Sequence, residues 1–75
     1  MITIKLKYPL TYFDVLNEIL SNLIISLNGT VNNSGTELRY KSMEINFLSK
    51  IDLDNFLTKI RDLEYLIICN IISQN

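Results

Sequence analysis

Three side chains are candidates for covalent or acid–base chemistry. They are the single cysteine, Cys69, and the carboxylate pair Asp52 and Asp54. The chain has no histidine, so a Cys/His or Ser/His nucleophile–base pair cannot form within it. Cys69 lies in an apolar segment, where a thiol usually behaves as a small hydrophobic group. Asp52 and Asp54 stand at an expected helix start, where carboxylates are ordinary capping and dipole partners. The sequence therefore predicts a protein that is not an enzyme.

The same residues predict neither a cofactor nor a metal. One cysteine without histidine cannot build a Cys/His metal cluster or an intrachain disulfide. The two glycines, Gly29 and Gly35, belong to no G-x-G or G-K-S phosphate-binding pattern, and the Gly-x-x-Gly turn of KH-type RNA binders is missing. Seven basic and eight acidic side chains give no electrostatic footprint for nucleic acid. A mild basic strip remains, made of Lys5, Lys7, Arg39 and Lys41.

The chain shows no targeting or membrane signal. Residues 1–8 alternate apolar and polar side chains, whereas a secretory signal has an unbroken apolar run. The longest apolar runs fall far below the roughly 20 residues that span a bilayer, so we expect a cytoplasmic protein with no membrane contact. The 75 residues predict a single domain, 1–75, that buries only about 60% of its unfolded surface. Oligomerisation is the available way to stabilise so small a domain.

Two elements can be predicted at the start of the chain. Alternation over Ile2–Tyr8 predicts a half-buried strand that Pro9 ends. A helix of about seventeen residues follows, because apolar residues recur at helical spacing. Thr11 and Asp14 resemble a capping pair at its start, and Asn28-Gly29 supplies a stop at its end.

A loop and a hairpin are expected in the middle of the chain. Residues 29–35 have the composition of a mobile loop. Alternation over 36–40 and again over 43–47, on either side of Lys41-Ser42, predicts two antiparallel strands.

The segment 51–75 decides the fold. Ser49 or Asp52 can cap a helix start, and no Gly or Pro interrupts the chain from there to Asn75, so one long helix is the preferred interpretation. This gives an α+β fold, a three-stranded antiparallel sheet with two helices on one face in the order strand-helix-strand-strand-long helix. The alternative breaks the helix near Leu63 and makes 64–72 a fourth strand, which its β-branched residues favour. That gives a split βαβ, ferredoxin-like fold.

The second half of the closing segment is apolar almost all the way round. Residues 53–63 would serve the core of the chain itself, while the surface beyond them is too apolar to face water and indicates a protein partner. The predicted partner interface consists of six side chains: Leu63, Leu66, Ile67, Ile68, Ile71 and Ile72.

With the preferred order of elements, the chain resembles the small Pcc-type subunits of the KEOPS tRNA-modification complex. The resemblance is carried by Tyr8-Pro9-Leu10 before the first helix, by the polar hairpin from Glu37 to Leu48, and by a Ser/Asp-led closing helix rich in Leu and Ile. Leu57-Thr58 and Arg61-Asp62 stand where Leu-Arg and Asn-Ser are expected, which would suit a diverged paralogue.

The resemblance implies a non-catalytic scaffold. Such subunits dimerise, with an identical or related small subunit, and dock their helices on the larger catalytic subunit that makes threonylcarbamoyl-adenosine in tRNA. The tRNA itself would be contacted only indirectly. The alternative fold implies a different function, a free-standing homodimeric ligand-sensing or regulatory module, in which the Asn28–Gly35 segment would be the ligand loop.

Overall fold

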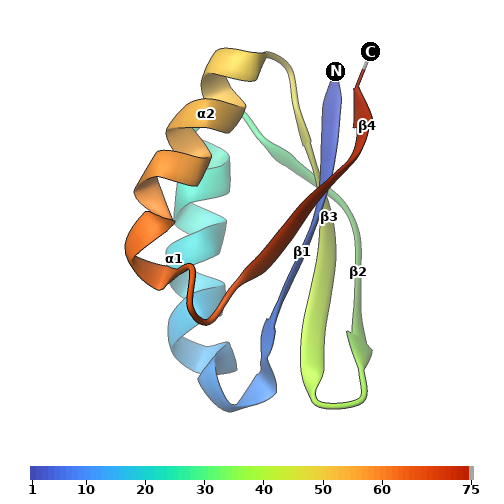
Figure 1. The fold of residues 1–75 in the computed structure, drawn as a ribbon, viewed down its shortest axis with the longest axis vertical. Helices are drawn as coiled ribbons and strands as arrows, with labels where there is room; N and C mark the ends of the chain where they lie inside the picture. The colour runs from blue at the N-terminus through green and yellow to red at the C-terminus, as the bar shows by residue number, and fades with distance from the viewer. Residues whose placement is uncertain (75) are drawn as a thin grey trace.

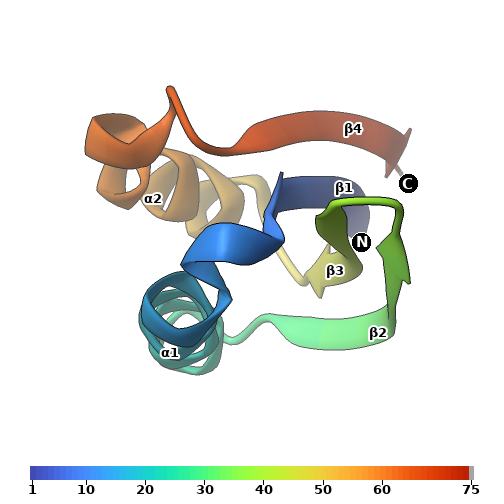
Figure 2. The same cartoon turned by 90° about the horizontal axis from the view of Figure 1, so that it is seen from below.

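The computed structural model describes residues 1–74 as one sheet covered on one face by two helices. The elements in chain order are β1 (Ile2–Pro9), the 3-10 turn η1 (Leu10–Tyr12), α1 (Phe13–Ser26), β2 (Thr30–Glu37), β3 (Tyr40–Phe47), α2 (Lys50–Lys59), the 3-10 turn η2 (Arg61–Leu63) and β4 (Ile68–Gln74). The antiparallel strands lie in the order β2-β3-β1-β4 (Figure 1). Figure 2 shows both helices on the same side of the sheet. This is the ferredoxin-like βαββαβ arrangement.

The closing segment is not one long helix. α2 ends at Lys59, and after η2 the chain extends as β4 along β1. The prediction of one long closing helix was therefore wrong, and the alternative with a fourth strand is confirmed, although that strand begins at Ile68 and not at residue 64. The predicted α+β class, with an antiparallel sheet and two helices on one face, is confirmed. β-Branched isoleucines favour extended backbone, and the free side of β1 supplies a ladder of backbone partners. The helix formers in 61–64 form only short turns.

The expected loop over 29–35 is also wrong, because most of it belongs to β2. Every residue of β2 is exposed, so the strand has no buried face and shows no alternation of apolar and polar residues. A β-bulge between Val31 and Asn33 interrupts its register with β3. The turn of this hairpin is Leu38-Arg39 and not Lys41-Ser42.

The predicted first strand and first helix are confirmed. One face of β1 is buried by the two helices, and the ring centroids of Phe47 on β3 and Phe56 on α2 lie 5.1 Å apart across that interface. The buried core consists of Ile2, Ile4, Leu6, Tyr8, Leu16, Leu20, Ile24, Met43, Ile45, Phe47, Leu53, Phe56, Ile60 and Ile67. In the described part of the chain, neither helix is long and apolar enough to cross a membrane.

The two helices start differently. The predicted cap at Thr11 is wrong, because α1 begins at Phe13 and the side chain of Tyr12 in the N-cap position makes no capping bond. The predicted cap at Ser49 is confirmed, since its hydroxyl oxygen accepts a hydrogen bond of 3.2 Å from the backbone N–H of Asp52.

Candidate functional site: an open apolar sheet edge

The six side chains of the predicted interface fall into two groups. Ile67 is buried, with 6% of its surface exposed, and Leu63 and Leu66 are partly buried against the core. These three residues pack η2 and the residues that precede β4 against the core of the domain. The other three stay about half exposed: Ile68 at 52%, Ile71 at 50% and Ile72 at 50%. All three lie on β4.

β4 is an open edge of the sheet. β1 pairs with it on one side, from Lys7 opposite Ile68 to Ile2 opposite Gln74, and no other described strand lies on its outer side. No charged residue occurs from Ile67 to Gln74. Proteins usually protect such edges with charges, prolines or a covering segment, because the unpaired N–H and C=O groups are a template for another strand.

The register of β4 exposes apolar side chains on both faces of the sheet. Cys69 lies opposite Leu6 and Ile71 opposite Ile4, so both belong to the face that the helices cover. Ile68 and Asn70 lie opposite Lys7 and Lys5 on the uncovered face. The register shifts between the pair Ile4–Ile71 and the pair Thr3–Ser73. Ile72 is therefore the additional residue of a β-bulge.

A groove of about 510 Å³ lies between α2, the turns that follow it and the start of β4, where Cys69 lines it. The less exposed part of its lining is apolar and consists of Leu57, Ile60, Ile67 and Cys69, and the exposed part consists of Asp54, Thr58, Arg61 and Glu64. Burial raises the pKa of the Cys69 thiol. The thiol is therefore protonated near neutral pH and serves as part of an apolar wall.

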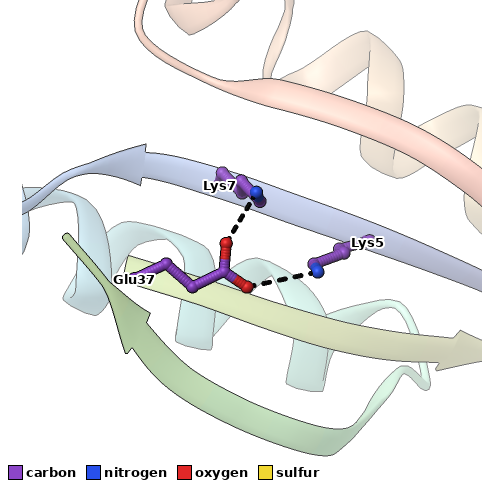
Figure 3. A network of polar contacts seen from close by, with 3 residues as sticks. All are labelled: Lys5, Lys7 and Glu37. Carbon is purple, nitrogen blue, oxygen red and sulfur yellow. Dashed lines mark hydrogen bonds and ion pairs between the residues drawn. The ribbon is translucent and has the colours of Figure 1, made fainter. Parts of the chain in front are cut away.

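The opposite edge strand, β2, has a different character. Its side chains are almost all polar, and it ends at Glu37, whose carboxylate reaches over β3 to Lys7 Nζ at 2.7 Å and to Lys5 Nζ at 3.3 Å (Figure 3). The bonds from Lys7 and then Lys5 lower the pKa of this carboxyl group. Polar side chains, a bulge and a charge make β2 a protected edge.

Within the predicted basic strip, Lys41 does not join Lys5 and Lys7, because it lies opposite the buried Tyr8 on the other face of the sheet. Lys5 and Lys7 are paired with Glu37, as described above. Lys41 lies elsewhere, with its Nζ 5.7 Å from the ring centroid of Phe13 at the start of α1. Within residues 1–74, no three His, Cys, Asp or Glu side chains gather as a metal site.

The groove could not be found from the sequence, because it appears only when β4 folds back beside α2. Leu57 and Ile60 then line it from the helix, while Cys69 lines it from the strand. The one local signal was the long uncharged, isoleucine-rich run that ends the chain.

Neither a scan against protein-family models nor a search of curated proteins gave a match for this chain.

Proposed function

We propose that this protein is a non-catalytic association module that binds another polypeptide along the outer edge of β4. The observation that carries the proposal is the composition of this edge strand. No charged residue occurs from Ile67 to Gln74, and the side chains of Ile68, Ile71 and Ile72 are about half exposed. An extended partner segment can add to such an edge through main-chain hydrogen bonds, while alternate side chains enter an adjoining pocket. The groove between β4 and α2 has the position and apolar lining of that pocket.

Association along β4 would stabilise the domain as well as the complex. Fully burying an isoleucine is worth about 1.5–3 kcal/mol, so covering three half-exposed ones supplies about 2–5 kcal/mol before the new hydrogen bonds are added. The total stability of a protein is about 5–15 kcal/mol, and a domain of this length lies at the low end. Folding and binding of this chain would therefore be coupled.

A scaffold role in the KEOPS complex stays a prediction within this proposal. The order of strand, helix, hairpin and helix through Lys59 supports it. Since β4 replaces the expected closing helix, docking on a catalytic subunit or a related small subunit would use the strand edge, and tRNA would be contacted only indirectly. The cytoplasmic location likewise stays a prediction from the sequence.

A second candidate function, the homodimeric ligand-sensing or regulatory module, is favoured by the presence of β4, on which that fold depends. Its expected ligand loop is mainly the strand β2. The hollow beside β2 has a volume of about 190 Å³ and is lined in part by Lys5, Glu37 and Glu44. Because Lys5 is already paired with Glu37, the charge that this hollow can offer a ligand is mainly the carboxylate of Glu44.

Affinity capture with matched edge variants tests the association function. Tagged wild-type protein in extract of its own cells should retain a polypeptide, which can be a second copy or another protein. Ile68→Asp places a charge on the β4 edge and should abolish retention, while Val31→Asp places it on the β2 edge and should leave retention unchanged. Circular dichroism of both variants checks that they fold. Equal retention by Ile68→Asp and the wild type would exclude β4 as the binding edge.

A further inference from the structure

We infer that the polypeptide that adds to β4 is β4 of a second copy of this chain, antiparallel and related by a two-fold axis at Asn70. This inference rests on the proposed function, because it names the partner for the same edge. The two four-stranded sheets would join into one continuous sheet, with the helices of both copies on the same face.

The residue types of β4 match themselves in this register. With Asn70 opposite its symmetry mate, Cys69 lies opposite Ile71 of the second copy on the helix-covered face, and the reverse contact occurs across the axis. Asn70 lies on the uncovered face, where two amides can each donate and accept a hydrogen bond. Moving the axis by one residue in either direction would place Asn70 opposite an isoleucine, Ile72 or Ile68. Only the axis at Asn70 pairs amide with amide among these three arrangements.

The groove beside β4 fits the same arrangement. Cys69 is part of the groove lining together with Leu57 and Ile60. Ile71 of the second copy, lying directly opposite Cys69, would cover this apolar lining with a side chain that is half exposed in the single chain. The two-fold axis makes this contact twice.

Charge does not oppose the pairing of two copies. The strand itself carries no charge, and Lys5 and Lys7, which lie beside Asn70 and Ile68 on β1, are both bonded to Glu37 of the same copy. The exposed part of the groove lining has both signs, with Asp54 and Glu64 beside Arg61. β4 itself offers no opposite charge to a strongly acidic or basic partner strand, and an uncharged strand meets no repulsion from it.

A cross-link at the symmetry axis tests the register. The variant Cys69→Ser/Asn70→Cys has a single cysteine, which would face its own copy across the axis. Residues directly opposite in antiparallel strands have Cβ atoms about 4.5–5.5 Å apart, near the span that a disulfide bridges. Mild oxidation of the dilute protein should yield mainly covalent dimer. The control Cys69→Ser/Asn33→Cys keeps the β4 edge but has its cysteine on β2, so it should yield no covalent dimer. Equal cross-linking of both variants would overturn the proposed edge.

A charge exchange at Asn70 provides a second, non-covalent test. Asn70→Asp should fold, since the carboxylate lies opposite Lys5 in its own chain, but two carboxylates would meet at the axis and weaken the dimer at least about tenfold. Asn70→Lys should weaken it too, and an equimolar mixture of the two variants should restore a dimer as a heterodimer. Sedimentation velocity of the single proteins and the mixture measures this.

The outcomes separate this inference from the proposed function. Wild-type protein that sediments as a monomer at every concentration, while its β4 edge still captures a different polypeptide, would overturn the second-copy partner and leave the association function intact. Loss of β4-dependent capture as well would overturn both. A wild-type dimer that neither Asn70 substitution weakens would overturn the axis at Asn70.

Discussion

The backbone amide of Gly29 donates a hydrogen bond of 2.8 Å to the carbonyl oxygen of Ile24, which closes the last turn of α1. The amide of Asn28 donates to the carbonyl oxygen of Ile25 at 3.2 Å, so the pair forms a Schellman motif. Asn28 has the left-handed backbone conformation, with φ of 60°. Gly29 has no side chain, which leaves space for Ile24 and Phe47 beside it. A Cβ atom on Gly29 would lie 3.0 Å from Ile24 Cγ2 and 3.0 Å from Phe47 Cε1.

Gly29→Ala should destabilise the protein by about 1–3 kcal/mol, because the added methyl group overpacks the contact between α1 and β3. Gly35→Ala is the matched control, since a Cβ there meets nothing within 4 Å, and its effect should stay within about 0.5 kcal/mol. Urea unfolding of the two variants and the wild type measures both values. Equal midpoints for the two variants would contradict the close approach at Gly29.

Ser49→Ala should lower the stability by about 1 kcal/mol, because it removes the acceptor that caps α2. Thr11→Ala should have almost no effect, since the residue that precedes α1 is Tyr12 and α1 has no side-chain cap. The sequence pattern alone predicts a loss for both variants. Thermal unfolding of the pair thus tests the observed helix starts, and a comparable loss for Thr11→Ala would contradict them.

Leu38→Gly should stabilise the protein by up to about 1 kcal/mol, because leucine is held there in a conformation that suits glycine. Leu38 has φ of 51° in the β2–β3 turn and is 97% exposed, so its replacement loses hardly any packing. Leu48→Gly is the control, since Leu48 is also exposed, at 73%, but has no positive φ. That control should lower the melting temperature or leave it unchanged. A fall in melting temperature for Leu38→Gly would contradict strain in the turn.

Glu37→Gln should make the stability less dependent on pH. The pKa of Glu37 is lowered in the folded chain, first by the bond from Lys7 and then by that from Lys5. A lowered carboxyl pKa stabilises the fold above the usual glutamate pKa of about 4.3, and this contribution disappears as the pH falls through the lower folded value. The melting temperature of the wild type should therefore exceed that of the variant slightly at pH 7 and converge with it in acid.

Salt and a partner variant control this pH test. The carboxylate is half exposed, so the difference at pH 7 should shrink in about 1 M salt, where the screening length is about 3 Å. Lys7→Met, which removes the nearer cation, should reproduce most of the effect. An unchanged pH profile for Glu37→Gln would show that the ion pairs in Figure 3 add nothing to stability.

Local pattern predicted the elements that have one buried face and their own end signals. The alternation of β1, the helical spacing of α1, the stop at Asn28-Gly29 and the cap at Ser49 are all readable within a few residues. Residues 30–35 of β2 were missed because the strand is exposed throughout and owes its extended form to pairing with β3. No pattern of burial could appear in its sequence.

The conformation of the closing segment depends on pairing with β1, which is distant in the sequence. Residues 68–74 become a strand because β1 has an unpaired side at residues 2–7. That interaction lies outside any local window, and it outweighs the helix propensity around Arg61. The predicted exposed isoleucines Ile68, Ile71 and Ile72 are exposed as a strand edge, whereas the groove beside them joins residues of two elements and has no counterpart in the sequence pattern.

The pairing of Ile2 with Gln74 brings the two ends of the described chain to the same end of the sheet (Figure 1). Neighbouring strands lie about 4.8 Å apart, so a short flexible linker can join them and turn β1 and β4 into a hairpin. The chain could then be opened at Leu38-Arg39 as a circular permutant, or inserted into a surface loop of a carrier protein without spreading that loop. An inserted copy would be attached only at the start of β1 and the end of β4, so the outer side of β4 would stay accessible along the strand.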